Sequence, residues 1–360
     1  MSKQTPFYDC HKRANALIVD FAGWDMPLHY GSQIREHHEV RQHAGMFDVS
    51  HMGIVDLHGV DVLPYLRRLF ANDALRLHDG KALYTCMLND QGGVIDDLIV
   101  YKVSDDFYRL VINAGTREKD LLWMRKQKDS FQLDITERTD LVMLAIQGPE
   151  VTHKIESLFP PHEMEKIRHL KPFMFMIWNN HLIARTGYTG EDGYEMIFPA
   201  NEAEKYWQAL LDLGIPPCGL GSRDTLRLEA GLNLYGADMD ESITPFEANL
   251  GWTVSMDPKD RQFIGREALE NQMQQGIKRQ LVGLILEGPG IIRSHQKVLI
   301  ADNGAGEVTS GGYSPTLEKS IALARIPKDV GTECFVEIRE KPVKARVVKP
   351  PFVRHGKKMF

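Results

Sequence analysis

The sequence predicts an α+β fold that ends in an all-β domain, and three observations lead to this expectation. The chain has 360 residues, enough for two or three domains of roughly 100–200 residues each. Residues 53–138 combine β-rich runs, separated by turn residues, with two helical segments, which is typical of a compact α+β unit. From about residue 250 onward, strand-like segments alternate with Pro and Gly, which favours an all-β C-terminal domain.

The elements of the N-terminal half follow from caps and periodicity. Ser32 can cap a helix that ends before Gly45, where we expect a left-handed backbone to stop it. Two further helices are expected in LPYLRRLF and TREKDLLWMRKQ. Strands are expected in four runs, which are GIVDLHGVDV, ALYTCML, GGVIDDLIVYKV and FYRLVIN.

The second half continues with the same kinds of signal. Residues 181–198 read as a hairpin whose turn is formed by Asp192 and Gly193. A helix is expected in AEKYWQALLDL, and Ser222 can cap another one. The last strands are expected in VGLILEG, IALARIP, CFVEIR and VKARVVKPPFV.

Composition excludes several classes of function. The net charge is −6 with acidic and basic residues interspersed, so we expect neither a nucleic-acid nor a membrane partner. No targeting segment or apolar run of about 18 residues is present, and the four cysteines lie far apart without a C-x-x-C pair. These features predict a cytoplasmic protein with reduced thiols. His38 and His43 are five positions apart on a helix and face different ways, so no metal is assigned.

Asp97 is the first candidate for a chemical role. Because side chains alternate along a strand, Asp96 and Asp97 point to opposite faces, and the face of Asp97 carries no other charge. A carboxylate in a mostly apolar cavity suggests a place where cationic charge arrives or develops. The alternative is that both carboxylates bond to backbone in the turn after Gly92-Gly93.

Glu195 and two arginines are the next candidates. Glu195 could accept two hydrogen bonds from an amidine-like ring edge such as that of a pterin, although a solvent-facing Glu on a half-buried strand is the commoner case. Arg223 and Arg227 are four positions apart and share a helix face. Each either extends its head to solvent or binds an anion or a polar ring. The glycines of RTGYTGEDGYE lack the spacing and context of a dinucleotide site.

Taken together and in this order, the motifs closely resemble the aminomethyltransferases, the tetrahydrofolate-dependent T proteins of the glycine cleavage system. The likeness covers nearly the whole chain and runs through DFAGWDMPLHYGS, GMFDVSHMG, GKALYTCMLNDQGGVIDDLIVY, the NA and REKD of VINAGTREKDLLW, QGPE, RTGYTGEDGYE, GLGSRDTLRLEAGLNLYG, TPFEANLGW, FIGREAL, TSGGYSPTLEKSIALARIP and KPPFVR.

This resemblance implies a three-domain clover-leaf with folate in a central channel. The first domain would be discontinuous, formed by residues 1–52 and 139–244. Residues 53–138 would be an inserted α+β domain that carries Asp97, and residues 245–360 a C-terminal domain resembling a β-barrel or jelly roll.

The resemblance also implies roles for individual residues. Asp97 would lie near the folate nitrogen that becomes cationic, and Glu195 with Arg227 would bind the pterin. The remaining folate-binding residues would be Tyr84, Asn113, Tyr188, Trp252 and, as a weaker transfer because the tail varies, Arg354.

The implied reaction transfers the methylene carbon of an S-aminomethyl-dihydrolipoyl carrier protein to tetrahydrofolate, with release of ammonia. Tetrahydrofolate would be a co-substrate, and no metal, flavin or pyridoxal phosphate is expected. The lipoyl-bearing carrier, the H protein, would be a transient partner. Alternatives are a folate-binding relative that acts in demethylation, or in RNA modification and iron–sulfur maintenance, and a noncatalytic folate-binding subunit. A demethylating relative normally carries a flavin domain, for which this chain leaves no room. The relative that acts in RNA modification carries a K-G-C-Y motif, which this sequence lacks.

Overall fold

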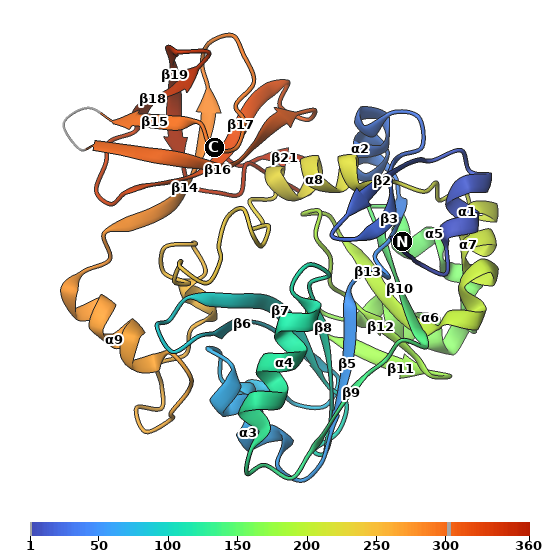
Figure 1. Ribbon diagram of the computed structural model, residues 1–360. Coiled ribbons are helices and arrows are strands. Elements are labelled where there is room, and N and C mark those ends of the chain that lie inside the picture. Colours follow the sequence, from blue (N-terminus) through green and yellow to red (C-terminus); the bar gives the residue numbers. More distant parts are fainter. Residues whose placement is uncertain (1, 301–303) are drawn as a thin grey trace. The chain divides into compact units, whose positions relative to one another are not determined.

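The computed structural model describes residues 2–300 and 304–360 and shows a mixed α+β protein (Figure 1). The chain forms two compact units, each assembled from separate stretches. Unit 1 comprises Met1–Val62, Leu77–Leu83 and Ile99–Asp224, and unit 2 comprises Leu63–Arg76, Tyr84–Leu98 and Thr225–Phe360. The α+β class is confirmed, whereas the division into three domains stays a prediction.

A five-stranded sheet lies at the centre of unit 1, in the order β11-β12-β13-β10-β4. Its strands are β4 (Gly45–Asp48), β10 (Leu141–Gln147), β11 (Phe175–Trp178), β12 (His181–Ala184) and β13 (Gly193–Pro199). A smaller sheet contains β1 (Lys3–Gln4), β2 (Leu17–Phe21) and β3 (Trp24–His29). The surrounding helices are α1 (Tyr8–Arg13), α2 (Gln33–Gln42), α5 (Val151–Lys154), α6 (Pro161–His169) and α7 (Ala203–Asp212).

Helical periodicity explains how α7 joins the core of unit 1. Its buried residues are Ala203, Tyr206, Trp207 and Leu210, which recur at three- and four-residue spacing and so form one stripe. They pack in the same cluster as the inward residues of the central sheet, among them Val142, Leu144, Ile146, Tyr194, Met196 and Phe198. These alternate residues of β10 and β13 face one side, as expected for strands.

The region expected to be a compact α+β unit forms a second five-stranded sheet, in the order β6-β7-β8-β5-β9. Its strands are β5 (Gly53–His58), β6 (Lys81–Leu88), β7 (Val94–Lys102), β8 (Phe107–Ile112) and β9 (Asp134–Glu137), and its helices are α3 (Val62–Leu69) and α4 (Arg117–Lys128). All the strands and helices predicted in this region are therefore confirmed.

Six strands close into a barrel at the C-terminal end, drawn in orange and red in Figure 1. They are β14 (Arg279–Leu286), β15 (Lys297–Ile300), β16 (Gly304–Ser314), β17 (Lys319–Pro327), β18 (Glu333–Ile338) and β19 (Lys341–Val348). A short hairpin of β20 (Val353–Arg354) and β21 (Lys357–Lys358) follows. The all-β expectation is confirmed from residue 279, but α9 (Arg266–Gln275) lies in the preceding stretch that was expected to be β.

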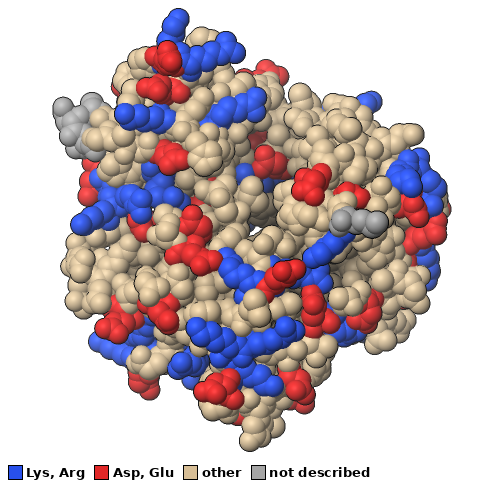
Figure 2. All heavy atoms as spheres, in the orientation of Figure 1, with Lys and Arg blue, Asp and Glu red and all other residues tan. Residues whose placement is uncertain are grey.

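The remaining elements are α8 (Leu220–Glu229) and four 3-10 helices, Ala74–Arg76, Glu156–Leu158, Ala200–Glu202 and Gly251–Thr253. In the described part of the chain, no helix combines the length and the apolar character needed to cross a membrane. Figure 2 shows acidic and basic side chains next to one another over the visible face, as the interspersed charges predict.

Contrary to expectation, Gly45 does not end α2, because the helix already ends at Gln42 with His43 as its C-cap. Its backbone is not left-handed; it is the first residue of β4, and a Cβ there would lie 2.6 Å from Cys218 Sγ and 2.7 Å from Val40 Cγ2. Close packing, not backbone conformation, requires glycine at this position.

The Asp192-Gly193 turn and the Ser222 cap are also corrected. Strands β12 and β13 do form the predicted antiparallel hairpin, but residues 185–192 make a longer loop, with Gly190 at φ +79° and Gly193 already in the strand. Helix α8 begins at Leu220, so Ser222 lies in its first turn, where its hydroxyl donates to the Gly219 carbonyl at 2.9 Å.

Candidate functional site

Asp97 lies in unit 2 beside two aromatic side chains that sequence reasoning assigned to the same site. The hydroxyl of Tyr84, on β6, donates a hydrogen bond to Asp97 Oδ2, on β7, at 2.7 Å. The ring of Tyr84 stacks with that of Trp252 at a centroid distance of 5.6 Å and an angle of 25°. Trp252 is 64% exposed, so the stacked pair has one face available to solvent.

The two adjacent aspartates differ in burial. Asp96 has no exposed surface, whereas Asp97 is half-buried. Both carboxylates influence the nearby Cys86 thiol, whose pKa is raised first by burial and further by Asp97 and Asp96. Of the two, Asp97 is the one whose carboxylate is both fixed by a phenol and partly accessible.

Glu195 lies in unit 1 on β13, a strand with neighbours on both sides. Its partners across the ladders are Ala145 on β10 and Ala184 on β12. Glu195 is only 6% exposed, and its Oε2 accepts a hydrogen bond from Thr186 Oγ1 at 2.6 Å. Burial raises the pKa of Glu195, while the Thr186 hydrogen bond and the charge of Arg223 act in the opposite direction. Glu195 is therefore a buried acceptor and not the solvent-facing side chain of the commoner case.

Arg223 is the residue that sequence reasoning did not assign to the pterin. Its guanidinium carbon lies 4.7 Å from the centroid of the Tyr188 ring, a cation–π distance. Burial lowers the pKa of Arg223, and Glu195 and Tyr188 partly offset this effect. Its Nη1 is buried and has no hydrogen-bond partner among the described residues. Arg223, Tyr188 and Glu195 thus form one polar group in unit 1.

Arg227, which was assigned to the pterin, is bound by its own chain. Its Nη1 contacts Asp238 Oδ2 at 3.0 Å, and both terminal nitrogens lie 3.1 Å from Ser310 Oγ. The side chains of Arg227 and Asp238 are 4% and 0% exposed. This buried ion pair favours a structural role for Arg227, and its assignment to the pterin stays an untested prediction.

The last two predicted residues are Asn113, in unit 1, and Arg354, in unit 2. Asn113 directly follows β8, and its carbonyl accepts a hydrogen bond from Thr116 Oγ1 at 3.2 Å. Arg354 is exposed on β20, opposite Lys357. Their assignment to the site stays a prediction.

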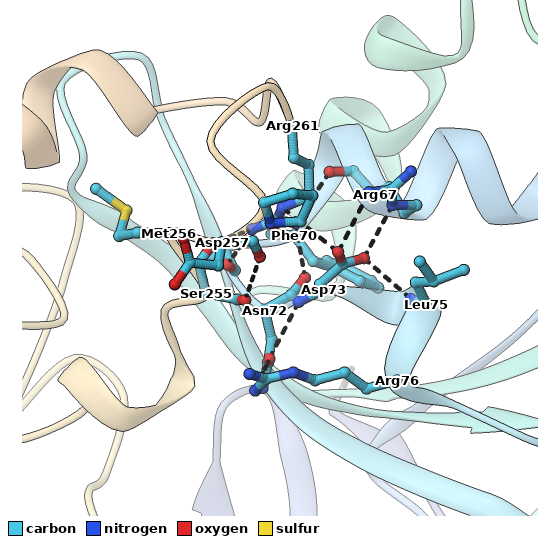
Figure 3. A network of polar contacts seen from close by, with 12 residues as sticks. Arg67, Phe70, Asn72, Asp73, Leu75, Arg76, Ser255, Met256, Asp257 and Arg261 are labelled. Atoms are coloured by element: carbon cyan, nitrogen blue, oxygen red, sulfur yellow. Dashed lines mark hydrogen bonds and ion pairs between the residues drawn. The ribbon is translucent and has the colours of Figure 1, made fainter.

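A buried arginine of unit 2, Arg261, forms the network of backbone contacts that Figure 3 shows. Arg261 donates to the carbonyls of Phe70, Ala71, Asn72 and Arg67 and to that of Ser255, three residues after Trp252. The Asn72 side chain in turn donates to the carbonyl of Tyr84 at 3.2 Å. The segments that carry Tyr84 and Trp252 are therefore joined through one guanidinium.

Comparison with known proteins places the chain in a family. Residues 7–258 match the model of the GCVT N-terminal domain, and residues 279–354 match that of the glycine cleavage T-protein C-terminal barrel domain. An aminomethyltransferase of Alcanivorax borkumensis is 57% identical over 360 residues, which is 100% of this chain and 99% of the relative. A crystal structure of the glycine cleavage system aminomethyltransferase T from Bartonella henselae superimposes with a TM-score of 0.92 at 34% identity, covering 99% of both chains. The resemblance inferred from the motifs is confirmed, and the chain belongs to the glycine cleavage T-protein family of aminomethyltransferases.

Proposed function

We propose that this aminomethyltransferase passes the methylene carbon of an aminomethyl group, held by sulfur on a lipoyl arm, to tetrahydrofolate. Two bonds form between that carbon and folate nitrogens, while its bonds to the amine nitrogen and to sulfur break. The two folate N–H protons end on ammonia and on the released thiol. Family membership supports the transferase class, and the contacts of Glu195, Arg223 and Asp97 support the assignment of roles.

Glu195 and Arg223 would bind the pterin edge. A buried carboxylate accepts hydrogen bonds from an amino group and a ring N–H, and a guanidinium donates to a carbonyl oxygen. The cation–π contact with Tyr188 orients the guanidinium before any ligand arrives. The single observation that carries this proposal is that one unit holds a buried acceptor, Glu195, and a buried donor nitrogen, Arg223 Nη1, that has no hydrogen-bond partner in the described chain.

Asp97 would stabilise the positive charge that develops on the reacting nitrogen and would handle its proton. A carboxylate already fixed by Tyr84 needs little reorganisation when that charge develops. The exposed ring of Trp252 would help to exclude water, which otherwise captures an iminium-like carbon. A covalent ester with Asp97 is not required.

We further propose that the lipoyl-bearing carrier, the H protein, docks transiently, because it must also visit other enzymes of its system. The proposed setting is the cytoplasm, and metal, flavin and pyridoxal phosphate have no part in the proposed reaction.

A single assay tests the proposal. The purified protein is mixed with aminomethylated lipoyl carrier, with and without tetrahydrofolate, and ammonia and methylene-tetrahydrofolate are measured. We expect stoichiometric formation of both products only with tetrahydrofolate. Ammonia release at the same rate without folate would contradict the proposed acceptor.

A further inference from the structure

His51 is a buried histidine whose ring lacks a hydrogen-bond partner at Nδ1. The residue is 3% exposed, and its Nδ1 is buried without any partner among the described residues. Another buried histidine of unit 1, His11, uses both ring nitrogens, with Asp48 at 2.9 Å and the Tyr30 hydroxyl at 2.8 Å. A buried polar atom without a hydrogen-bond partner destabilises the folded protein, so we looked for a ligand that could supply the partner of His51 Nδ1.

The sheet register places His51 at the end of β5. Gly53 is paired with Ile112 of β8, and the antiparallel register runs from there to His58 and Phe107. The residues just before Gly53 therefore leave the sheet at the same end as Asn113, which follows β8. His51 is thus brought to the sheet end that carries Asn113, whose role in folate binding is itself a prediction from the family resemblance.

The β2–β3 hairpin connects His51 with the start of α8. The ring of Phe21, the last residue of β2, meets that of His51 edge-on at 5.5 Å. On β3, the carbonyl of Leu28 lies so close to Gly219, the residue before α8, that a Cβ there would be 2.4 Å from it. This packing fixes the first turn of α8, which carries Arg223, against the same hairpin. The pKa of His51 is lowered first by burial and, to a smaller extent, by the positive charge of Arg223.

The chemistry of His51 complements that of its neighbours. Burial lowers the pKa of His51 to about 4, with a smaller opposing effect from Asp48, so the ring is neutral near pH 7. A neutral imidazole offers one donor and one acceptor, whereas Arg223 only donates and ionised Glu195 only accepts. Two residues of this region, His51 and Arg223, therefore each keep a nitrogen for which the described chain supplies no partner.

We propose that His51 is a further substrate-contacting residue, whose neutral imidazole hydrogen-bonds the heteroaromatic ring that Arg223 and Glu195 hold. This inference rests on the proposed function, because it takes the pterin ring of tetrahydrofolate as the ligand. The contact is one hydrogen bond at His51 Nδ1, which donates or accepts according to the tautomer of the ring.

Calorimetry with 5-formyl-tetrahydrofolate tests this role on the full-length protein. His51→Leu should raise the Kd about tenfold or more, and His51→Asn, which keeps a donor and an acceptor, should recover part of the loss. Without ligand, the melting temperature of His51→Leu should be unchanged or higher, because an unpartnered polar group has been removed from the interior. His181→Leu is the matched control, since His181 is also 3% exposed in unit 1 and packs against Phe198 and Tyr206. Its Kd should equal that of the wild type.

A second measurement needs no folded leucine variant. In wild-type protein labelled with ¹⁵N-histidine, the His51 ring signals, assigned by their loss in His51→Asn, should shift when 5-formyl-tetrahydrofolate is added. Unchanged His51 signals, or a His51→Leu Kd within twofold of a wild type that binds, would overturn the role of His51 and leave the proposed function intact. A wild type that does not bind the folate would instead overturn the proposed function and this inference with it.

Discussion

The two carboxylates to which we assign roles in the proposed reaction, Asp97 and Glu195, occupy different environments. Asp97 is half-buried and held by one phenol from Tyr84, whereas Glu195 is 6% exposed and held by Thr186 with Arg223 nearby. A buried, pre-bonded carboxylate suits recognition of a neutral donor edge, because it is already oriented and desolvated. An accessible carboxylate with one fixed oxygen suits stabilisation of a charge that arises during reaction. We therefore expect the environment of each carboxylate, and not the residue type, to decide which one binds folate and which one takes part in the reaction.

Replacing Asp97 should give the largest effect on turnover. Asp97→Asn keeps shape and can still accept from Tyr84, but it removes the negative charge, so turnover should fall by about 10²-fold or more. Steady-state ammonia release measures this change. Asp96→Asn is the control; because Asp96 has no exposed surface, we expect it to affect melting temperature more than turnover. Greater loss of turnover in a folded Asp96→Asn protein would reverse the assignment.

Substitutions of the two arginines of α8 should have different effects, one on folate affinity and the other on the stability of the fold. Arg223→Met should weaken folate binding by about tenfold to a hundredfold and leave the melting temperature nearly unchanged, because it breaks no ion pair among the described residues. Arg227→Met leaves Asp238 buried without its partner and should lower the free energy of unfolding by about 3–5 kcal/mol. Calorimetry and denaturant titration check both variants. Loss of folate affinity confined to Arg227→Met would restore the sequence-based assignment.

A smaller effect on turnover is expected when the hydroxyl of Tyr84, which donates to Asp97, is removed. Tyr84→Phe removes the 2.7 Å hydrogen bond but keeps the ring that stacks on Trp252. A hydrogen bond to a charged group contributes about 1.5–3 kcal/mol at most, so turnover should fall by roughly tenfold, with little change in folate affinity. Steady-state kinetics would show a change in kcat. A change in KM alone would mean that Tyr84 only binds substrate.

The smallest effect concerns stability against pH. Because burial raises the pKa of Glu195, the folded protein holds this proton to a higher pH than the unfolded chain does. The contribution of protonated Glu195 to the stability of the folded protein is fully present below the unfolded pKa of about 4.3. It is lost as the pH rises through the pKa of Glu195 in the folded protein. Wild type should therefore lose stability relative to Glu195→Gln as pH rises through this interval. Parallel stability curves for the two proteins would show that the Glu195 pKa is not raised.

Alternation and helical spacing predicted most elements correctly, because strands such as β7 and helices such as α7 carry their burial pattern in their own residues. Alternation also selected Asp97 over Asp96, whereas for Glu195 it favoured a solvent-facing side chain, and the assignment of Glu195 to folate came from the family resemblance. The local pattern could not choose between Arg223 and Arg227, which share a helix face. That choice depends on Asp238 and on Ser310 in the barrel, 83 residues from Arg227 in the chain.

The expected helix stop at Gly45 and the expected helix cap at Ser222 were both wrong, because both positions depend on contacts with residues distant in the sequence. Gly45 packs against Cys218, and Gly219, which precedes α8, packs against Leu28; both partners are far away in the sequence. The sequence pattern could not identify His51 as a candidate. The missing hydrogen-bond partner of its Nδ1 is recognised only when the residues around the ring are known.

Parallel measurement of folate affinity and single-turnover rate in Asp97→Asn and Glu195→Ala tests the central claim most directly. Asp97→Asn should keep the wild-type Kd for 5-formyl-tetrahydrofolate within about twofold while its single-turnover rate at saturating folate falls about 10²-fold or more. Glu195→Ala should bind folate more weakly by about 1–3 kcal/mol and keep a single-turnover rate within a few-fold of wild type. Equal losses of affinity and rate in both variants, or the reverse division, would contradict the separation of a recognition carboxylate from a reaction carboxylate.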